Sequence, residues 1–200
     1  MTCKMGLLRA FLASELPIPL QENIQSATTG LRKDLGNDLI RWVPVHNVHL
    51  TLIFLGDISS SSLDLIKQMM VTEAAQVQAF DIQVEGLGSY PNSRRPRILW
   101  VGLNAPATLT YLQHALEAAA ARLGYAPEER EFSPHLTIGR VRQNVSAADQ
   151  QKIRNMLEGT KVGHLGTVCV DGVHLFKSDL QPSGSLYTKL FSAPLLKTQQ

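Results

Sequence analysis

The sequence predicts a mixed α and β protein made of two similar halves that pack against each other. The segment VHLTLIFLG at 48–56 has a counterpart, PHLTIGRV at 134–141, and each contains His-Leu-Thr followed by Leu or Ile. Around each copy we expect the same order of elements: a buried strand, a helix, the His-x-Thr strand and a helix preceded by serine. No low-complexity linker separates the halves, so two packed lobes are expected instead of independent domains.

The first half begins with an expected strand at residues 7–13. A helix is expected next, because apolar residues recur at spacings of three and four: Leu20, Ile24, Ala27, Leu31 and Leu35. The first His-Leu-Thr strand covers 48–55. The helix after it is preceded by Ser61-x-x-Asp64, a pattern that resembles a capping box.

The second half opens on two expected strands, an alternating one at FDIQVEGLG (80–88) and a more fully buried one at 97–103. The next helix has a clear apolar face: Leu109, Leu112, Leu116, Ala120 and Leu123. The second His-Leu-Thr strand, 134–141, leads to a helix opened by another possible box, Ser146-x-x-Asp149.

Two strands, near 167–177 and 185–191, are expected to finish the chain. The whole chain, 1–200, is therefore expected to be a single bilobal domain with an internal repeat of about ninety residues. The expected parts are a first repeat, a second repeat and the closing strands, at approximately 7–75, 97–158 and 167–191.

The composition is that of an ordinary soluble globular protein, with 44% hydrophobic and 18% charged residues. A net charge of +2 and a pI near 8.6 argue against a dedicated duplex-DNA binder and leave room for a small anionic substrate. No apolar run approaches the ~20 residues that span a bilayer, so no membrane partner is expected. Cys3 and Cys169 show no zinc-like spacing, and two free thiols in a reducing cytoplasm are expected.

The repeated His-x-Thr predicts a site for acid–base chemistry. Successive side chains of a strand face opposite ways, so His49 shares a face with Thr51, and His135 with Thr137. If a pseudo-twofold relates the halves, both pairs face one cleft. One neutral imidazole can then accept a proton while a protonated one donates, near the ordinary histidine pKa of ~6.5. The threonines suit hydrogen bonds to phosphate oxygens. Arg140 either supplies a cation to the same group or is a solvated arginine at the end of the strand.

No metal or other cofactor is expected. There is no H-E-x-x-H, no carboxylate within either motif and no third histidine at a useful spacing. His46 stands three positions before His49, an offset that on a strand predicts a side chain facing elsewhere. His114, His164 and His174 show no partner pattern, and surface or satisfied core positions are expected for them.

The motifs resemble those of the two-histidine (2H) phosphoesterases, which are defined by paired His-x-Thr/Ser-x motifs. The closer resemblance is to the bacterial RNA 2′,3′-cyclic phosphodiesterases, also called 2′-5′ RNA ligases. It covers nearly the whole chain, in the expected order: LLRAFLASELP, WVPVHNVHLTLIFLG, YPNSRRPRILWVGL, FSPHLTIGRVR and VHLFKSDLQPSGSLYTKL. His-x-Thr-x alone is a loose pattern, but both copies together with the Pro-Arg-rich loop and the SDLQPSGSLY ending are specific.

This resemblance implies an α+β fold of two similar lobes related by a pseudo-twofold, with antiparallel sheets lining a central cleft and helices outside, the LigT-like fold. It implies metal-independent opening of an RNA 2′,3′-cyclic phosphate to a 2′-phosphomonoester. By position, His49 would be the proton donor to the 3′ oxygen and His135 the acceptor that activates water. Thr51 and Thr137 would hold the phosphate oxygens. His46, where relatives often carry a carboxylate, and Ile53, where many have a basic residue, depart from the pattern.

Several alternatives stay open on the sequence. The cleft can run backwards and join a 2′,3′-cyclic end to a 5′-hydroxyl, or act on a cyclic ADP-ribose phosphate, or only bind RNA or nucleotide without catalysis. Arg94, Arg95 and Arg97 either meet an RNA backbone or form a solubilising loop. Three aromatic residues are candidates for stacking a base and equally for the core, namely Phe11, Phe54 and Tyr187. A monomer is the default expectation.

Overall fold

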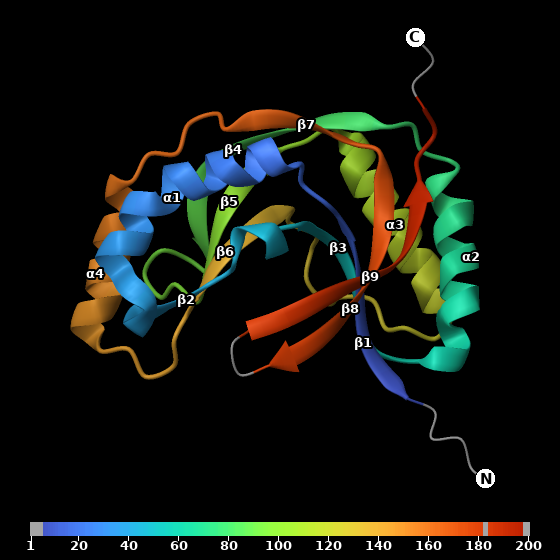
Figure 1. The fold of residues 1–200 in the computed structure, drawn as a ribbon, viewed down its shortest axis with the longest axis horizontal. Coiled ribbons are helices and arrows are strands. Elements are labelled where there is room, and N and C mark those ends of the chain that lie inside the picture. Colours follow the sequence, from blue (N-terminus) through green and yellow to red (C-terminus); the bar gives the residue numbers. More distant parts are fainter. Residues whose placement is uncertain (1–5, 182–183, 198–200) are drawn as a thin grey trace.

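The computed structural model describes residues 6–181 and 184–197 (Figure 1). In chain order its helices and strands are β1 (Leu7–Ser14), α1 (Ile18–Leu39), β2 (Ile40–Trp42), η1 (Val45–Asn47), β3 (Leu50–Ser59), η2 (Ser60–Ser62), α2 (Leu63–Ala74), β4 (Phe80–Tyr90), β5 (Ile98–Asn104), α3 (Ala107–Arg122), β6 (His135–Val141), α4 (Ala147–Gly159), β7 (Gly166–Val170), β8 (Gly172–Gln181) and β9 (Gly184–Pro194). None of the helices in this part of the chain is long and apolar enough to cross a membrane.

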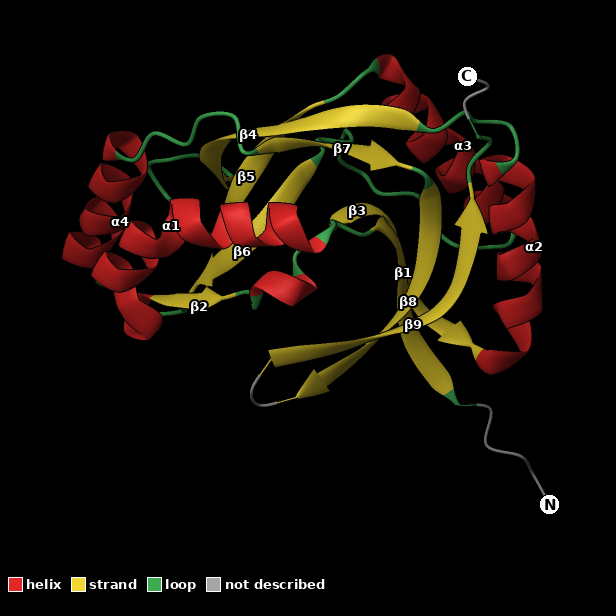
Figure 2. Cartoon of the chain, turned by 45° about the horizontal axis from the view of Figure 1, so that its top comes forward, coloured by secondary structure: helices red, strands yellow, loops and turns green. Residues whose placement is uncertain are grey.

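All the strands belong to one curved sheet, in the order β7-β4-β5-β6-β3-β1-β8-β9, with β2 added to β6 (Figure 2). Every pairing between these strands is antiparallel. At the centre, β3 and β6 meet through one residue pair, Leu50 with Leu136. The predicted α+β fold with antiparallel lobes is confirmed, and the two halves of the sheet are joined at this pair.

Each lobe combines elements from both halves of the chain. One lobe contains β3, β1, β8 and β9, and its helices are α2 and α3, which pack together. The other contains β6, β5, β4 and β7 with β2, and its helices are α1 and α4. Figure 1 shows the two helix pairs at opposite ends of the molecule, with the sheet between them. Helix α1 thus follows β1 in sequence but packs on the other lobe.

The apolar residues of the two motif strands fix which face of the sheet is buried. Leu50 and Leu136 are fully buried, as is Ile138, and Leu52 is 3% exposed. Burying one such side chain stabilises the fold by roughly 1.5–3 kcal/mol, and a one-residue slip would expose the whole set. The alternate residues, His49 and the others of the motifs, are therefore held on the opposite face.

Helix starts and strand ends agree only in part with the sequence prediction. Ser146 caps α4 as predicted, because its Oγ accepts a hydrogen bond from the Asp149 N–H at 3.1 Å. The predicted cap at Ser61 is wrong: Ser61 lies inside the 3₁₀ turn η2, and α2 begins at Leu63 with Ser62 at its N-cap and no side-chain cap bond. The strand expected at 167–177 is two strands, β7 and β8, which separate at Asp171.

In α1, Thr28 takes the buried position that the apolar pattern had given to Ala27. Its hydroxyl donates to the Ile24 carbonyl at 2.8 Å, so the buried polar group is satisfied within the helix.

Candidate active site

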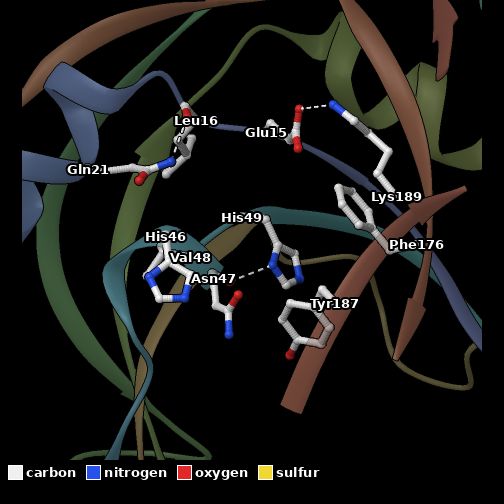
Figure 3. Close-up of a pocket in the computed structure, with 10 residues that line it drawn as sticks. All are labelled: Glu15, Leu16, Gln21, His46, Asn47, Val48, His49, Phe176, Tyr187 and Lys189. Atoms are coloured by element: carbon white, nitrogen blue, oxygen red, sulfur yellow. Dashed lines mark hydrogen bonds and ion pairs between the residues drawn. The ribbon is translucent and has the colours of Figure 1, made fainter. Parts of the chain in front are cut away.

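His49 lies between the 3₁₀ turn η1 and strand β3, in a setting that fixes its ring. Its Nδ1–H donates to the Asn47 carbonyl at 2.7 Å, drawn as a dashed line in Figure 3. The imidazole is stacked on Phe11 of β1, with ring centroids 4.8 Å apart, and meets Tyr187 of β9 edge-on at 5.2 Å. These contacts leave Nε2 as the ring nitrogen available to another molecule.

His135 is the first residue of β6 and is held in the same way. Its Nδ1–H donates to the Ser133 carbonyl at 2.8 Å, so both histidines bond the carbonyl two residues before them. Tyr90 meets the His135 ring edge-on, with centroids 5.0 Å apart, and its hydroxyl shares a 2.6 Å hydrogen bond with Ser133 Oγ. The two imidazoles therefore have the same tautomer when neutral, with Nε2 as the acceptor.

The two motif threonines lie on the face that carries the histidines. Thr51 pairs with Ala13 of β1, and Thr137 pairs with Trp100 of β5. Because β3 and β6 are antiparallel about the pair Leu50 and Leu136, each histidine lies near the threonine of the other motif. All four side chains are half-buried, and the two motif segments that carry them meet at the junction of the lobes.

A β-bulge brings Arg140 onto this face. Strict alternation from His135 would point Arg140 to the core side, but the register of β6 against β5 shifts between Thr137 and Gly139. After the shift Arg140 pairs with Ile98, whose side chain lies on the same face as that of Trp100, two residues further along β5. The Arg140 charge lowers the pKa of both histidines, as expected of a cation facing the same space. The bulge therefore turns Arg140 to the side of the sheet that carries the His-x-Thr pairs.

The pKa of both imidazoles lies below the ordinary histidine value. Burial is the main cause for His49, and the Arg140 and His135 charges lower it further, while the bond to Asn47 acts in the opposite direction. Burial also dominates for His135, followed by the opposing bond to Ser133 and the lowering effect of Arg140. At neutral pH the protein without ligand holds both rings largely uncharged, and an anionic group between them would raise both pKa values.

A pocket of about 380 Å³ opens beside His49 (Figure 3). The lining comes from the β1–α1 connection, the start of α1, the η1 turn with the two residues after it, and strands β8 and β9: Glu15, Leu16, Gln21, His46, Asn47, Val48, His49, Phe176, Tyr187 and Lys189. Glu15 and Lys189 form an ion pair at 2.7 Å on its wall. The expectation that His46 faces elsewhere is wrong, because His46 lies in the turn η1, where the two-residue alternation of a strand does not apply.

Other residues singled out in the sequence fall in several places. Arg94, Arg95 and Arg97 are exposed in the β4–β5 loop, where the Arg94 and Arg95 N–H groups donate to Asn92 Oδ1. His174 lies on β8, with Nδ1 at 2.9 Å from Ser192 Oγ and Nε2 3.8 Å from Glu15. No group of three histidine, cysteine or acidic side chains in the described segments is arranged to hold a metal ion. Cys169 is a free thiol, and Cys3 lies outside the described residues.

The aromatic candidates separate into core and surface. Phe11 is 3% exposed and forms a small cluster with Phe176, against which the half-buried Tyr187 packs. Phe54 is 52% exposed, and its ring centroid lies 6.0 Å from that of Phe11. Tyr90 and Trp100 were not predicted; their ring centroids lie 5.4 Å apart, and Tyr90 contacts His135. Their alternation on two strands was visible in the sequence, but nothing in it indicated that their shared face is the one carrying His135.

A bilobal α+β fold that sets two such imidazoles at the junction of its lobes defines the class of 2H phosphoesterases. Within this class, the model of the 2′-5′ RNA ligase superfamily matches residues 16–181, and the chain belongs to this family.

Individual relatives agree with this placement. The chain is 30% identical to the RNA 2′,3′-cyclic phosphodiesterase of Methanothermobacter thermautotrophicus, over 92% of this chain and 96% of that protein. Among solved structures, TT0787 of Thermus thermophilus superposes with a TM-score of 0.79 at 26% identity, covering 96% of this chain and all of the other. Escherichia coli LigT complexed with NADP+ superposes with a TM-score of 0.72 at 25% identity, covering 96% of this chain and 99% of the other.

Proposed function

We propose that this protein hydrolyses the 2′,3′-cyclic phosphate at an RNA end to a 2′-phosphomonoester. The observation that carries the proposal is the matched pair of imidazoles, each held through Nδ1 by the carbonyl two residues before it, on one face where the lobes meet. The name of the M. thermautotrophicus relative supports the same activity. A site that only bound phosphate would need donors, but not two titratable rings fixed in this way.

In the proposed reaction, His135 acts as the general base. Its neutral Nε2 takes a proton from a water molecule, whose oxygen attacks phosphorus while the bond from phosphorus to the 3′ oxygen breaks. His49, as imidazolium, gives its Nε2 proton to the departing 3′ oxygen. The ribose leaves with a 3′-hydroxyl and a 2′-phosphate, and the two histidines have exchanged protonation states. Transfer of one proton through water resets the pair.

The carbonyl bonds support both roles. A bond from Nδ1–H to a carbonyl keeps the neutral tautomer with a free Nε2, which the base requires. The same bond stabilises the imidazolium that His49 needs as acid, as its raising effect on the His49 pKa indicates. The negative phosphate opposes the pKa-lowering effects of burial and Arg140, so the proposed acid gains its proton when substrate is bound.

We propose that Thr51 and Thr137 donate hydrogen bonds to the non-bridging phosphate oxygens and that Arg140 supplies positive charge. The charge on these oxygens grows as water attacks, so donors already in place stabilise the transition state more than the substrate. The bulge in β6 supports this role for Arg140, because it turns the guanidinium toward the face of the histidines.

We propose that the terminal nucleoside lies on the His49 side of the phosphate. His49 protonates an oxygen of that nucleoside's own ribose, so the base is directed toward the adjoining pocket of about 380 Å³. Polar groups of Gln21 and Asn47 line this pocket and suit the edge of a base. The nucleotide complex of E. coli LigT, a protein of the same fold, agrees with nucleotide binding in this fold.

The same groups allow the reverse reaction, in which a 5′-hydroxyl oxygen takes the place of water and a 2′-5′ bond forms.

All residues assigned here come from one chain, so we propose that the whole chain acts as one bilobal unit and works as a monomer. The free thiol of Cys169 suits a reducing cytoplasm, which we propose as its location.

The test is release of 2′-phosphate from an RNA oligomer ending in a 2′,3′-cyclic phosphate, in excess EDTA. Turnover that persists in EDTA and yields only the 2′-phosphomonoester is expected. Tight binding of the oligomer by the folded protein without any turnover would contradict the proposal and favour a binding module.

A further inference from the structure

Two arginines lie directly opposite each other at the edge of the site. Arg41 of β2 pairs with Arg140 of β6, and cross-strand partners project from the same face of a sheet. Their neighbours agree with this assignment: Ile40 is fully buried, and a Cβ placed on Gly139 would meet Ile40 and Trp42. The Arg41 side chain therefore projects from the same face of the sheet as that of Arg140, which is the face of the histidines.

Strand β2 is also close to the site along the chain. It occupies the side of β6 that β3 leaves after the pair Leu50 and Leu136, and the turn η1 connects it to His49. Along β6, the threonine proposed to hold the reacting phosphate, Thr137, therefore comes first, and the two guanidinium groups follow it on the same face.

Like charges directly opposite each other on a sheet are unfavourable, and neither Arg41 nor Arg140 forms an ion pair with another described residue. Both residues are exposed. No ion pair or side-chain hydrogen bond joins either guanidinium to any residue in 6–181 or 184–197. Paired Cβ atoms lie about 5 Å apart, so the two flexible side chains can each meet one of two neighbouring anions. Two phosphates in succession along RNA are such anions.

We propose that Arg41 binds a second RNA phosphate, next to the phosphate that Arg140 helps to hold. This inference rests on the proposed function. The second phosphate comes from one of two sources: the phosphodiester on the 5′ side of the terminal nucleotide, or the first phosphodiester of a strand that brings a 5′-hydroxyl to be joined.

The experiment compares kcat/KM for a nucleoside 2′,3′-cyclic phosphate with that for a dinucleotide bearing the same end. Arg41→Gln is expected to lower the preference for the dinucleotide at least tenfold, and Arg41→Lys to retain part of it. The salt dependence of log kcat/KM for the dinucleotide should weaken by about 0.7, the value of one phosphate contact in a single strand. Arg154→Gln, on helix α4 away from the site, removes the same charge and is the matched control.

The possible results separate clearly. If Arg41→Gln leaves the dinucleotide preference unchanged but lowers joining to a 5′-hydroxyl oligomer, Arg41 serves the incoming strand. Unchanged preference and unchanged joining, or loss of preference in Arg95→Gln instead, would overturn the assignment of Arg41. If the unmodified protein turned over neither substrate, the proposed function would fail and this inference would fail with it.

Discussion

Replacing Gly88 by alanine should disturb the His135 side of the site through Trp100. A Cβ at Gly88 would lie 2.3 Å from two atoms of the Trp100 indole, whereas ordinary contact begins at 3.4 Å. The ring must retreat by about an ångström, and overpacking of this kind costs about 1–3 kcal/mol. Trp100 contacts Tyr90, which contacts His135 and bonds Ser133, so the displacement reaches the proposed base.

For a chain of this size each kcal/mol shifts Tm by about 2–4 °C, so Gly88→Ala should lower Tm by about 2–12 °C. The rate of a reaction falls steeply when a catalytic group is misplaced, so kcat/KM for cyclic phosphate opening should fall by about 10–100-fold. Gly30→Ala is the matched control, because nothing lies within 4 Å of its Cβ on helix α1. It should raise stability by about 0.5–1 kcal/mol without loss of activity. Wild-type Tm and kcat/KM in Gly88→Ala would refute the packing argument.

The same contacts lead to three more expected outcomes. The profile of kcat/KM against pH should be bell-shaped with its optimum below pH 6.5, because both histidines have a lowered pKa. Activity should rise as His135 loses its proton and fall as His49 loses its own. Arg140→Gln should move both limbs of the profile to higher pH, and a profile that stays in place would contradict the assignment. Phe11→Ala should lower the free energy of unfolding, measured in urea, by about 3–5 kcal/mol. Phe54→Ala, at an exposed position, should lower it by about 1 kcal/mol or less. Equal losses would show that Phe11 is not a core residue that supports His49. Ser146→Ala should cost about 1 kcal/mol by removing the cap of α4, and an unchanged Tm would mean that the bond to the Asp149 N–H contributes nothing.

The strands and the faces of the motif residues were predictable because they depend on local periodicity. Leu50 and Leu136 had to be buried, and alternation then put His49 and His135 on the other face. The cap at Ser146 was predictable for the same reason, since its bond partner lies three residues away. Ser61 shows the limit of such a pattern. It lies within a run of four serines, 59–62, of which Ser60–Ser62 form the turn η2 before the helix begins.

Features that depend on register or on distant segments could not be read from the sequence. No residue in the sequence indicates the bulge that turns Arg140 toward the histidines, because the bulge is a shift in the register between β6 and β5. Glu15 and Lys189, which form an ion pair, lie 174 positions apart in the sequence. The pocket beside His49 depends in turn on β8 and β9, which come from the far end of the chain but complete the lobe of β1 and β3.

In the proposed mechanism His49 gives a proton to the leaving oxygen while His135 takes one from water. The most direct test replaces the 3′ oxygen of a nucleoside 2′,3′-cyclic phosphate by sulfur, since a thiolate leaves without a proton at a pKa near 8.5. On the oxygen substrate His49→Ala and His135→Ala should each lose about 10²–10⁴ in kcat. On the sulfur substrate His49→Ala should recover most of its loss and His135→Ala should not. Equal losses by His49→Ala on both substrates would contradict its role as the acid.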